Sequence, residues 1–321
     1  MEKKHLSLSP KYRHTRQQAK EAESRRLAPL VLAMKALHSV SVPDSMDPEE
    51  LERQRKNQEI LGKLFSPMNG LNWESFTLGE ISAAWTRLPK GPACRRVILY
   101  CHGGGYTSGN LGYARVLSSK FCRVTGFDVL SFEYRLAPEH PYPAALEDAL
   151  LAWDYLMENH FAPENVILAG DSAGGNLALV LSLYLKEKGR PLPGALLLFS
   201  PWTDLTLSGE SLESRADIDP VLTPEYVRAV RDAYTNGASP DSPLLTPLLG
   251  DFAGFPPVLI QIGTNEILHS DSLRLEEKLK EAGVPCLLEE WDDMWHVFQM
   301  YPTKKASDAI RNTAYFLLSY L

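Results

Sequence analysis

The sequence contains few cysteines, and they are widely spread. Only four occur in 321 residues, at positions 94, 101, 122 and 286. Four is too few for the disulfide framework of a small secreted protein, and the cysteines and histidines show no paired short spacing of the kind that binds a metal. We therefore expect no metal site and a reducing, cytoplasmic location.

An excess of positive charge and a long hydrophobic run are also absent. Lysine and arginine number 33 against 40 aspartate and glutamate residues, a formal net charge of −7, which should repel nucleic acid. The most apolar early stretch, residues 27–37, contains Pro29 and Lys35 and is shorter than the roughly 20 residues that span a bilayer. We expect no membrane span, and no export signal either, since the charged segment 1–26 would be too long a leader.

What is present is the composition of an ordinary globular protein, with 44% hydrophobic and 23% charged residues. Residues 1–68 carry helical signals and no strand signal. Asp47, Pro48 and Glu50 stand in the order of an N-cap, a first-turn proline and a capping-box acid, which predicts that a helix begins there. We expect residues 1–68 to form an N-terminal helical cap segment and residues 69–321 to form the core.

The core segment alternates short apolar runs with longer helical windows. A hairpin is predicted over 73–78 and 81–88, and strand-sized runs follow at 97–101, 129–132, 166–169, 195–199, 258–262 and 287–291. Their near-continuous hydrophobicity indicates burial on both faces, so the sheet should be mainly parallel. Helical windows lie between the runs, at 112–125, 143–160, 173–188, 271–282 and 303–320, which is typical of an α/β fold. Residues 201–257, rich in Pro, Ser, Asp and Gly, predict an insertion above the sheet, with a helical window near 224–234.

The strongest chemical signal is Gly170-Asp171-Ser172-Ala173-Gly174, between a predicted strand and a predicted helix. A Gly-x-Ser-x-Gly sequence in that context is typical of a nucleophile elbow, a tight turn whose glycines avoid clashes. The turn lifts the serine hydroxyl off the sheet edge, sets it at the positive end of a helix and points the Ala173 amide at a developing oxyanion. Taken alone, the pattern also fits a glycine-rich turn that binds phosphate or nothing.

A second glycine-rich segment, His102-Gly103-Gly104-Gly105, follows the strand predicted at 97–101. In a fold with a nucleophile elbow, the other half of the oxyanion hole lies there, because consecutive glycines let amide N–H groups approach a substrate oxygen. A mobile loop or a phosphate cradle is the alternative, although the spacing is not Gly-x-Gly-x-x-Gly and no Walker lysine follows. We interpret His102 as a residue that braces the loop and not as a base.

A serine nucleophile needs a base, and the base needs a carboxylate that orients it. Of the eight histidines, His296 follows the last predicted strand, which suits the chain order serine, acid, histidine. The acid belongs in the loop after the strand at 258–262, where Glu266 lies nearest the strand end. Asp271 is the alternative, although its place beside the next helix is typical of an N-cap. We favour Glu266.

With these residues in place, the chain after about residue 70 resembles the bacterial hormone-sensitive-lipase-like esterases of the α/β-hydrolase superfamily. The resemblance rests on His102-Gly103-Gly104-Gly105-Tyr106, Tyr134-Arg135-Leu136-Ala137-Pro138-Glu139-His140-Pro141, Pro143-Ala144-Ala145, the elbow 170–175, Ser200-Pro201-Trp202-Thr203-Asp204 and Trp295-His296-Val297-Phe298. It implies an α/β-hydrolase fold with an eight-stranded sheet and a helical cap, no cofactor, and frequent homodimers. It also implies that the amides of Gly103 and Gly104, joined by Ala173, hold the oxyanion. Many members carry Asp-Pro-Leu where this chain has Glu266-Ile267-Leu268.

The combined hypothesis is a carboxylesterase that acts on small short-chain acyl esters through Ser172, His296 and Glu266, with a covalent acyl-enzyme. An amide or acetyl hydrolase with the same three residues is one alternative, and a hydrolase-fold protein that binds a small molecule without catalysis is another. Tyr106 and Trp202 are candidates for lining the substrate pocket, although aromatic residues at such positions often belong to the core.

Overall fold

A computed structural model describes residue 29, residues 46–92 and residues 94–321. Most of the predicted cap segment lies outside these residues, so the division of the chain at residue 68 stays a prediction. Helix α2 (Pro48–Phe65) begins where the sequence predicts a helix. Asp47 is its N-cap, because the side-chain Oδ1 accepts the N–H of Glu49 at 2.9 Å and satisfies a donor that has no partner within the helix.

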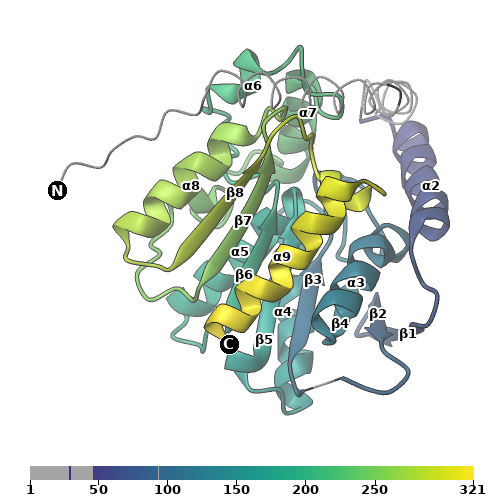
Figure 1. Ribbon diagram of the computed structural model, residues 1–321. Helices are drawn as coiled ribbons and strands as arrows, with labels where there is room; N and C mark the ends of the chain where they lie inside the picture. Colours follow the sequence, from purple (N-terminus) through teal and green to yellow (C-terminus); the bar gives the residue numbers. More distant parts are fainter. Residues whose placement is uncertain (1–28, 30–45, 93) are drawn as a thin grey trace, which may run out of the picture.

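The sheet has eight strands in the order β1-β2-β4-β3-β5-β6-β7-β8 (Figure 1). The first two strands pair antiparallel as the predicted hairpin, β2 pairs antiparallel with β4, and all later neighbours are parallel. The predicted fold class, a mainly parallel eight-stranded sheet flanked by helices, is therefore confirmed. The strands are β1 (Asn72–Leu78), β2 (Ile81–Arg87), β3 (Val97–Cys101), β4 (Asp128–Phe132), β5 (Val166–Asp171), β6 (Ala195–Phe199), β7 (Val258–Gly263) and β8 (Cys286–Trp291).

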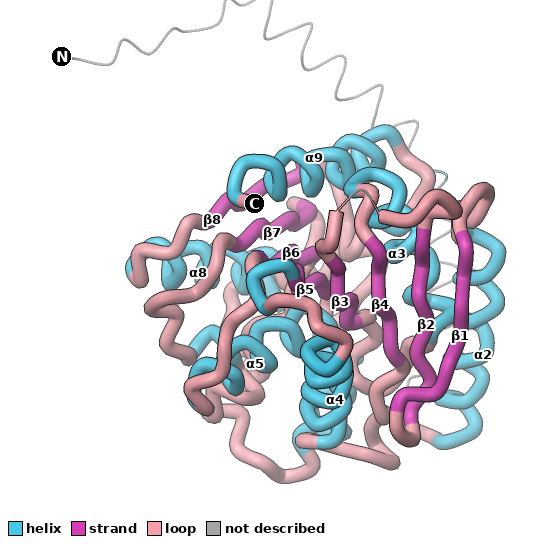
Figure 2. The backbone as a smooth tube through the Cα atoms, turned by 90° about the horizontal axis from the view of Figure 1, so that it is seen from below, coloured by secondary structure: helices cyan, strands magenta, loops and turns pink. Residues whose placement is uncertain are grey.

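Helices cover both faces of the sheet, as Figure 2 shows from below. Side chains alternate between the faces along each strand. On β3, Ile98 and Tyr100 pack with α3 (Leu111–Thr125) and α9 (Lys304–Tyr320), whereas Leu99 and Cys101 belong to the larger cluster on the other side. The helices of that side are α4 (Ala144–Glu158), α5 (Ala173–Glu187) and α8 (His269–Glu281). Burial on both faces explains why β3 to β7 are continuous apolar runs. For the run predicted at 287–291 the expectation was wrong, because β8 lies at the edge of the sheet and none of its residues is buried.

The predicted insertion connects the carboxyl end of β6 to β7 and carries α6 (Ser211–Ser214) and α7 (Pro224–Thr235), which lie at the top of Figure 1. Three short 3₁₀ helices complete the described elements: η1 (Pro163–Asn165), η2 (Pro247–Leu249) and η3 (Phe298–Met300). Because parallel strands end at one edge of the sheet, the loops after β3, β5, β7 and β8 gather beside this insertion. The predicted site residues follow those four strands.

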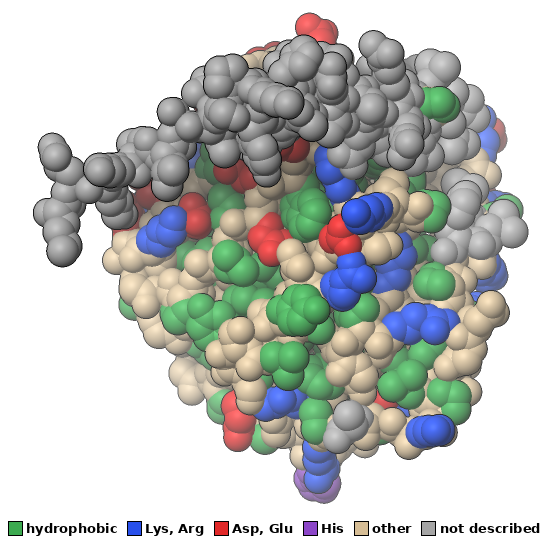
Figure 3. Space-filling view, in the orientation of Figure 1, with side chains coloured by type: hydrophobic (Ala, Val, Ile, Leu, Met, Phe, Trp, Pro, Cys, Tyr) green, Lys and Arg blue, Asp and Glu red, His purple; other side chains and the backbone are tan. Residues whose placement is uncertain are grey.

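The surface seen in Figure 3 mixes hydrophobic with polar and charged side chains. The large apolar side chains exposed on α9, which crosses this face in Figure 1, are Tyr315, Leu318 and Tyr320. Within the part of the chain that the structure describes, no helix has both the length and the apolar character needed to cross a bilayer.

Candidate active site

Ser172 occupies the turn between β5 and α5 in a strained conformation. Its φ of 54° and ψ of −122° lie where side-chain-bearing residues are rarely found. The backbone holds the turn, since the N–H of Ser172 donates to the carbonyl of Phe199 (2.9 Å) and its own carbonyl accepts the N–H of Trp202 (3.1 Å). A Cβ at Gly174 would lie 2.1 Å from the Cys101 carbonyl oxygen, so only glycine fits there. This geometry is that of the predicted elbow.

Glu266 and His296 form a buried pair. His296 Nδ1 lies 3.0 Å from Glu266 Oε2, and the exposed fractions of the two residues are 5% and 0%. The second carboxylate oxygen, Oε1, accepts the N–H of Gly263 (2.5 Å) and the hydroxyl of Ser200 (2.9 Å). The Ser200 hydroxyl oxygen in turn accepts the N–H of Val297 (3.1 Å). The carboxylate is thus held in place by the ends of β6 and β7, and the residue after the histidine is held with it.

The surroundings of His296 favour the protonated imidazole more than water does. Burial lowers the pKa of His296, but the hydrogen bond and charge of Glu266, together with the charges of Asp219 and Asp171, outweigh burial and raise the pKa above its usual value. One of these charges belongs to Asp171, the residue that directly precedes Ser172. The surroundings stabilise an imidazolium, which is what a general base becomes once it has accepted a proton.

Asp271, the alternative acid, has a different role. Its Oδ2 accepts the amide N–H groups of Thr203 and Asp204, both at 3.0 Å, and its Oδ1 lies 3.1 Å from the guanidinium of Arg274. Burial raises the pKa of Asp271 to about 7. The side chain anchors the loop after β6 to α8, and of the two candidate acids the structure pairs His296 with Glu266.

The glycine loop corrects one expectation. Gly103 was predicted to offer its amide to a substrate oxygen, but this N–H donates to Asp171 Oδ1 at 2.9 Å. In the described part of the chain, the amides of Gly104, Gly105 and Ala173 donate to no acceptor. Gly104 has a φ of 120°, and a Cβ there would lie 2.3 Å from the Ser108 carbonyl oxygen. Among the described residues of the glycine loop and the elbow, the N–H groups of Gly104, Gly105 and Ala173 are therefore the ones available to a bound group.

Asp171 is a residue whose role the sequence did not indicate. It is fully buried and accepts hydrogen bonds from the hydroxyls of Tyr100 (2.5 Å) and Tyr113 (2.6 Å) as well as from the Gly103 amide. Burial raises the pKa of Asp171, although the hydrogen bonds oppose that shift. The carboxylate ties the elbow to the glycine loop and to α3. An aspartate at the end of an otherwise apolar strand is the signal that points to such a partner.

His102 braces the glycine loop, in agreement with its interpretation. Its Nδ1–H donates to the Gly103 carbonyl at 2.8 Å, and its ring stacks on Tyr134 with centroids 4.2 Å apart. Burial lowers the pKa of His102 to about 4, so the ring is neutral at physiological pH.

Tyr106 and Trp202, the two candidates for lining the substrate pocket, lie in the core. Tyr106 stacks on Tyr234 with centroids 3.6 Å apart, and its hydroxyl donates to Asn176. Trp202 is 2% exposed and its carbonyl accepts from the Asn176 side chain. Both side chains are enclosed by protein, and their place in the lining of a substrate pocket stays a prediction. Their aromatic character stabilises the packing below the insertion.

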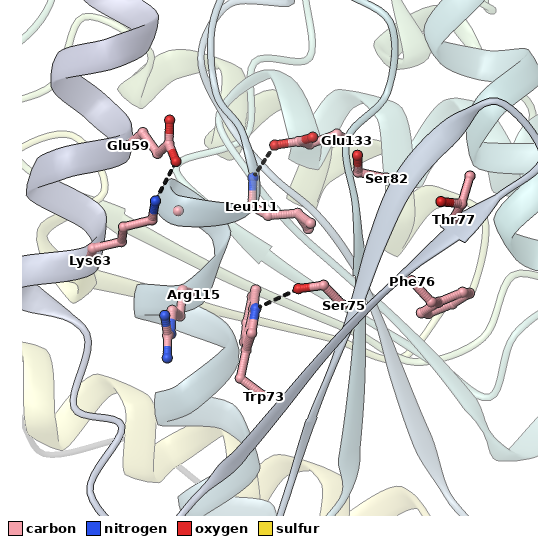
Figure 4. Close-up of a pocket in the computed structure, with 11 residues that line it drawn as sticks. Glu59, Lys63, Trp73, Ser75, Phe76, Thr77, Ser82, Leu111, Arg115 and Glu133 are labelled. Atoms are coloured by element: carbon pink, nitrogen blue, oxygen red, sulfur yellow. Dashed lines mark hydrogen bonds and ion pairs between the residues drawn. The ribbon is translucent and has the colours of Figure 1, made fainter.

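A pocket of about 440 Å³ lies elsewhere, between α2, α3 and the β1–β2 hairpin (Figure 4). It is lined by Glu59, Lys63, Trp73, Phe76, Arg115 and Glu133 among others, and the predicted site residues are not part of its lining. Its charged groups are engaged with protein neighbours: Lys63 pairs with Glu59, Glu133 accepts the Leu111 amide, and Arg115 lies over the Trp73 ring. Among the described residues, no group of three or more His, Cys, Asp or Glu residues is placed to hold a metal ion.

Comparison with known proteins agrees with this geometry. The family model of the α/β hydrolase fold matches residues 98–300. An acetyl-hydrolase of Streptomyces hygroscopicus is 40% identical over 244 residues, 76% of this chain and 80% of the relative. An esterase of Acinetobacter venetianus is 37% identical over 227 residues, 70% and 75% of the two chains. The crystal structure of an esterase from the bacterial hormone-sensitive lipase (HSL) family is 34% identical, with a TM-score of 0.84 over 91% of this chain and 97% of that one. The chain therefore belongs to the α/β-hydrolase fold family and, within it, to the bacterial HSL-like esterases.

Proposed function

We propose that this protein is a carboxylesterase that hydrolyses short-chain acyl esters through Ser172, His296 and Glu266. The observation that carries the proposal is the buried 3.0 Å contact between His296 Nδ1 and Glu266 Oε2, at the same sheet edge as a serine in a strained elbow. A histidine whose Nδ1–H points at a carboxylate offers Nε2 as the base. Membership of an esterase family supports the same assignment.

The proposed reaction has two halves. Ser172 Oγ attacks the ester carbonyl carbon while its proton passes to His296 Nε2. The bond from that carbon to the alcohol oxygen then breaks, the alcohol leaves with the proton from Nε2, and the acyl group remains on Ser172. Water attacks the acyl-enzyme in the same manner, which releases the acid and returns a proton to Ser172.

We assign the oxyanion hole of this reaction to the amides of Gly104, Gly105 and Ala173. The Gly103 amide already donates to Asp171, which is why Gly105 replaces it. The Ala173 amide stands at the first turn of α5, where the helix dipole adds to the attraction for negative charge.

Replacing the nucleophile is the direct test. Ser172→Ala should lower kcat/KM for p-nitrophenyl acetate by roughly 10³-fold or more, leaving the contributions of the oxyanion hole and of binding. Ser214→Ala changes an exposed serine of α6 in the same way and should leave the rate unchanged. An undiminished rate in folded Ser172→Ala protein would exclude the proposed nucleophile.

The two carboxylates are separated by a paired substitution. Glu266→Gln keeps the shape of the side chain but removes the charge next to His296, so kcat should fall strongly while the fold is kept. Asp271→Asn should reduce thermal stability more than kcat, because its partners are the amides of Thr203 and Asp204. The reverse pattern would assign the triad acid to Asp271.

A second candidate is hydrolysis of an acetyl amide. The observation that favours it is the 40% identical relative named acetyl-hydrolase, which is consistent with a small acyl group but leaves the leaving group open. Rates on p-nitrophenyl acetate and on p-nitroacetanilide compare the two leaving groups with the same acyl group. A series of p-nitrophenyl esters from acetate to decanoate then measures acyl length. We expect the ester to be favoured and the rate to fall with long chains.

A further inference from the structure

The insertion between β6 and β7 binds the acid loop, defined here as residues 264–268, through the backbone N–H and the backbone carbonyl of Ile267. Asp219 Oδ2 accepts a 2.9 Å hydrogen bond from the N–H of Ile267, the residue after Glu266. Ser211 Oγ donates a 2.6 Å hydrogen bond to the carbonyl of the same isoleucine. Both polar side chains are buried. The backbone next to the proposed triad acid is thus fixed from two directions by a segment far away in the sequence.

Asp219 is in turn held by its own segment. Its Oδ1 accepts the N–H groups of Val221 (2.8 Å) and Leu222 (3.0 Å). With Ile267 these make three amide donors to one carboxylate, which partly offset its desolvation and favour its charged form. The side chain is therefore a rigid link between the insertion and the acid loop.

The charge of Asp219 also acts on His296. The carboxylates that raise the pKa of His296 against the effect of burial come from three segments: Glu266 in the acid loop, Asp219 in the insertion and Asp171 in the elbow. Burial raises the pKa of Asp219 to about 6, opposed by the positive charge of His296 and by the amide donors. At the neutral or mildly alkaline pH of an esterase assay, Asp219 is therefore mainly charged.

We propose that Asp219 is a positioning residue of the site: it holds the acid loop so that Glu266 faces His296, and its charge stabilises the imidazolium that forms when Ser172 gives up its proton. This inference rests on the proposed function. It assigns the insertion a part in the chemistry. The sequence does not indicate the role, because Asp219 lies 48 positions before the amide that it holds.

The test compares Asp219→Asn with Asp217→Asn, which removes the same charge from an exposed side chain two residues away. Asparagine replaces one accepting oxygen by an NH₂ group, so at least one backbone N–H loses its acceptor. For Asp219→Asn we expect kcat on p-nitrophenyl acetate to fall about ten-fold, with KM changed less than about two-fold. The acid limb of the kcat/KM profile should move to lower pH by about half a unit or more, since His296 loses a neighbouring negative charge. Asp217→Asn should match the parent in both respects.

Asp219→Glu separates the effect of position from the effect of charge. It also provides a test of the inference if Asp219→Asn does not fold. The longer side chain displaces the acid loop but keeps the charge, so kcat should fall while the acid limb stays within about 0.2 pH unit of the parent. Circular dichroism and thermal unfolding establish that each variant is folded. An acid limb and a kcat that are both unchanged in folded Asp219→Asn would overturn the inference. A fall in kcat without a shift of the limb would overturn the role of the charge.

His296→Ala, measured alongside, separates this inference from the function on which it rests. If His296→Ala turns over ester at the parent rate, the proposed base is wrong, whatever Asp219 does. If His296→Ala is inactive and Asp219→Asn behaves like the parent, the proposed function stands and the role of Asp219 is refuted.

Discussion

Ser200→Ala tests whether one hydroxyl couples the proposed acid to the histidine loop. The Ser200 hydroxyl donates to Glu266 Oε1 at 2.9 Å and accepts the Val297 N–H at 3.1 Å, and the residue is fully buried. A hydrogen bond to a charged group contributes about 1.5 to 3 kcal/mol, and an unpaired buried amide costs about 1 to 3 kcal/mol. Because the two effects overlap, we expect the free energy of unfolding to fall by about 3 kcal/mol and the melting temperature to fall by roughly 5 to 10 °C.

The same substitution should lower kcat by about ten-fold, equivalent to about 1.4 kcal/mol. The effect is partial because Glu266 keeps the Gly263 amide and His296 as partners. The assays are steady-state hydrolysis of p-nitrophenyl acetate and thermal unfolding followed by circular dichroism. Ser214→Ala, on the surface of α6, is the matched control. If Ser200→Ala equals the parent in both kcat and melting temperature, the reasoning that this hydroxyl orients Glu266 is refuted.

Three further outcomes follow from the geometry. The pKa of His296 is raised above its usual 6.5, and only the neutral imidazole accepts a proton, so kcat/KM should decline as pH falls through a value above 6.5. A midpoint at or below 6.5 would contradict the effect that we assign to the neighbouring carboxylates. Gly104→Ala should lower kcat about 100-fold or more, because a Cβ would meet the Ser108 carbonyl at 2.3 Å in a conformation that favours glycine. Gly91→Ala is the control and should keep the activity of the parent, since Gly91 has open space around it. Equal rates for the two variants would mean that the glycine loop tolerates the change. Lys120→Met should lower the free energy of unfolding by about 2 kcal/mol, since Lys120 Nζ donates to the carbonyls of Gln299 and Met300 just after His296; urea unfolding that matches the parent would show that these contacts contribute nothing.

Local patterns in the sequence were sufficient for the fold. The strands β3 to β7 are short apolar runs whose residues are all buried, and the helix cap at Asp47 depends on residues three positions apart. The elbow is equally local, because the φ of Ser172 and the glycines around it are properties of one tight turn. The eight-stranded sheet and the placement of Ser172, Glu266 and His296 after strand ends follow from such signals.

Contacts between distant segments lie beyond local patterns. The Gly103 amide meets Asp171 across 68 positions, and the pairing of His296 with Glu266 instead of Asp271 depends on which carboxylate faces the last loop once β7 and β8 are side by side. The burial of Tyr106 under Tyr234 and the link from Asp219 to Ile267 arise in the same way, when the insertion packs onto the sheet edge. Residue types and their order along the chain set which elements form, because those interactions act over a few residues. The pairing of hydrogen-bond donors with acceptors from distant segments is decided by the tertiary structure, because these groups come together only when separate helices, strands and loops pack against one another.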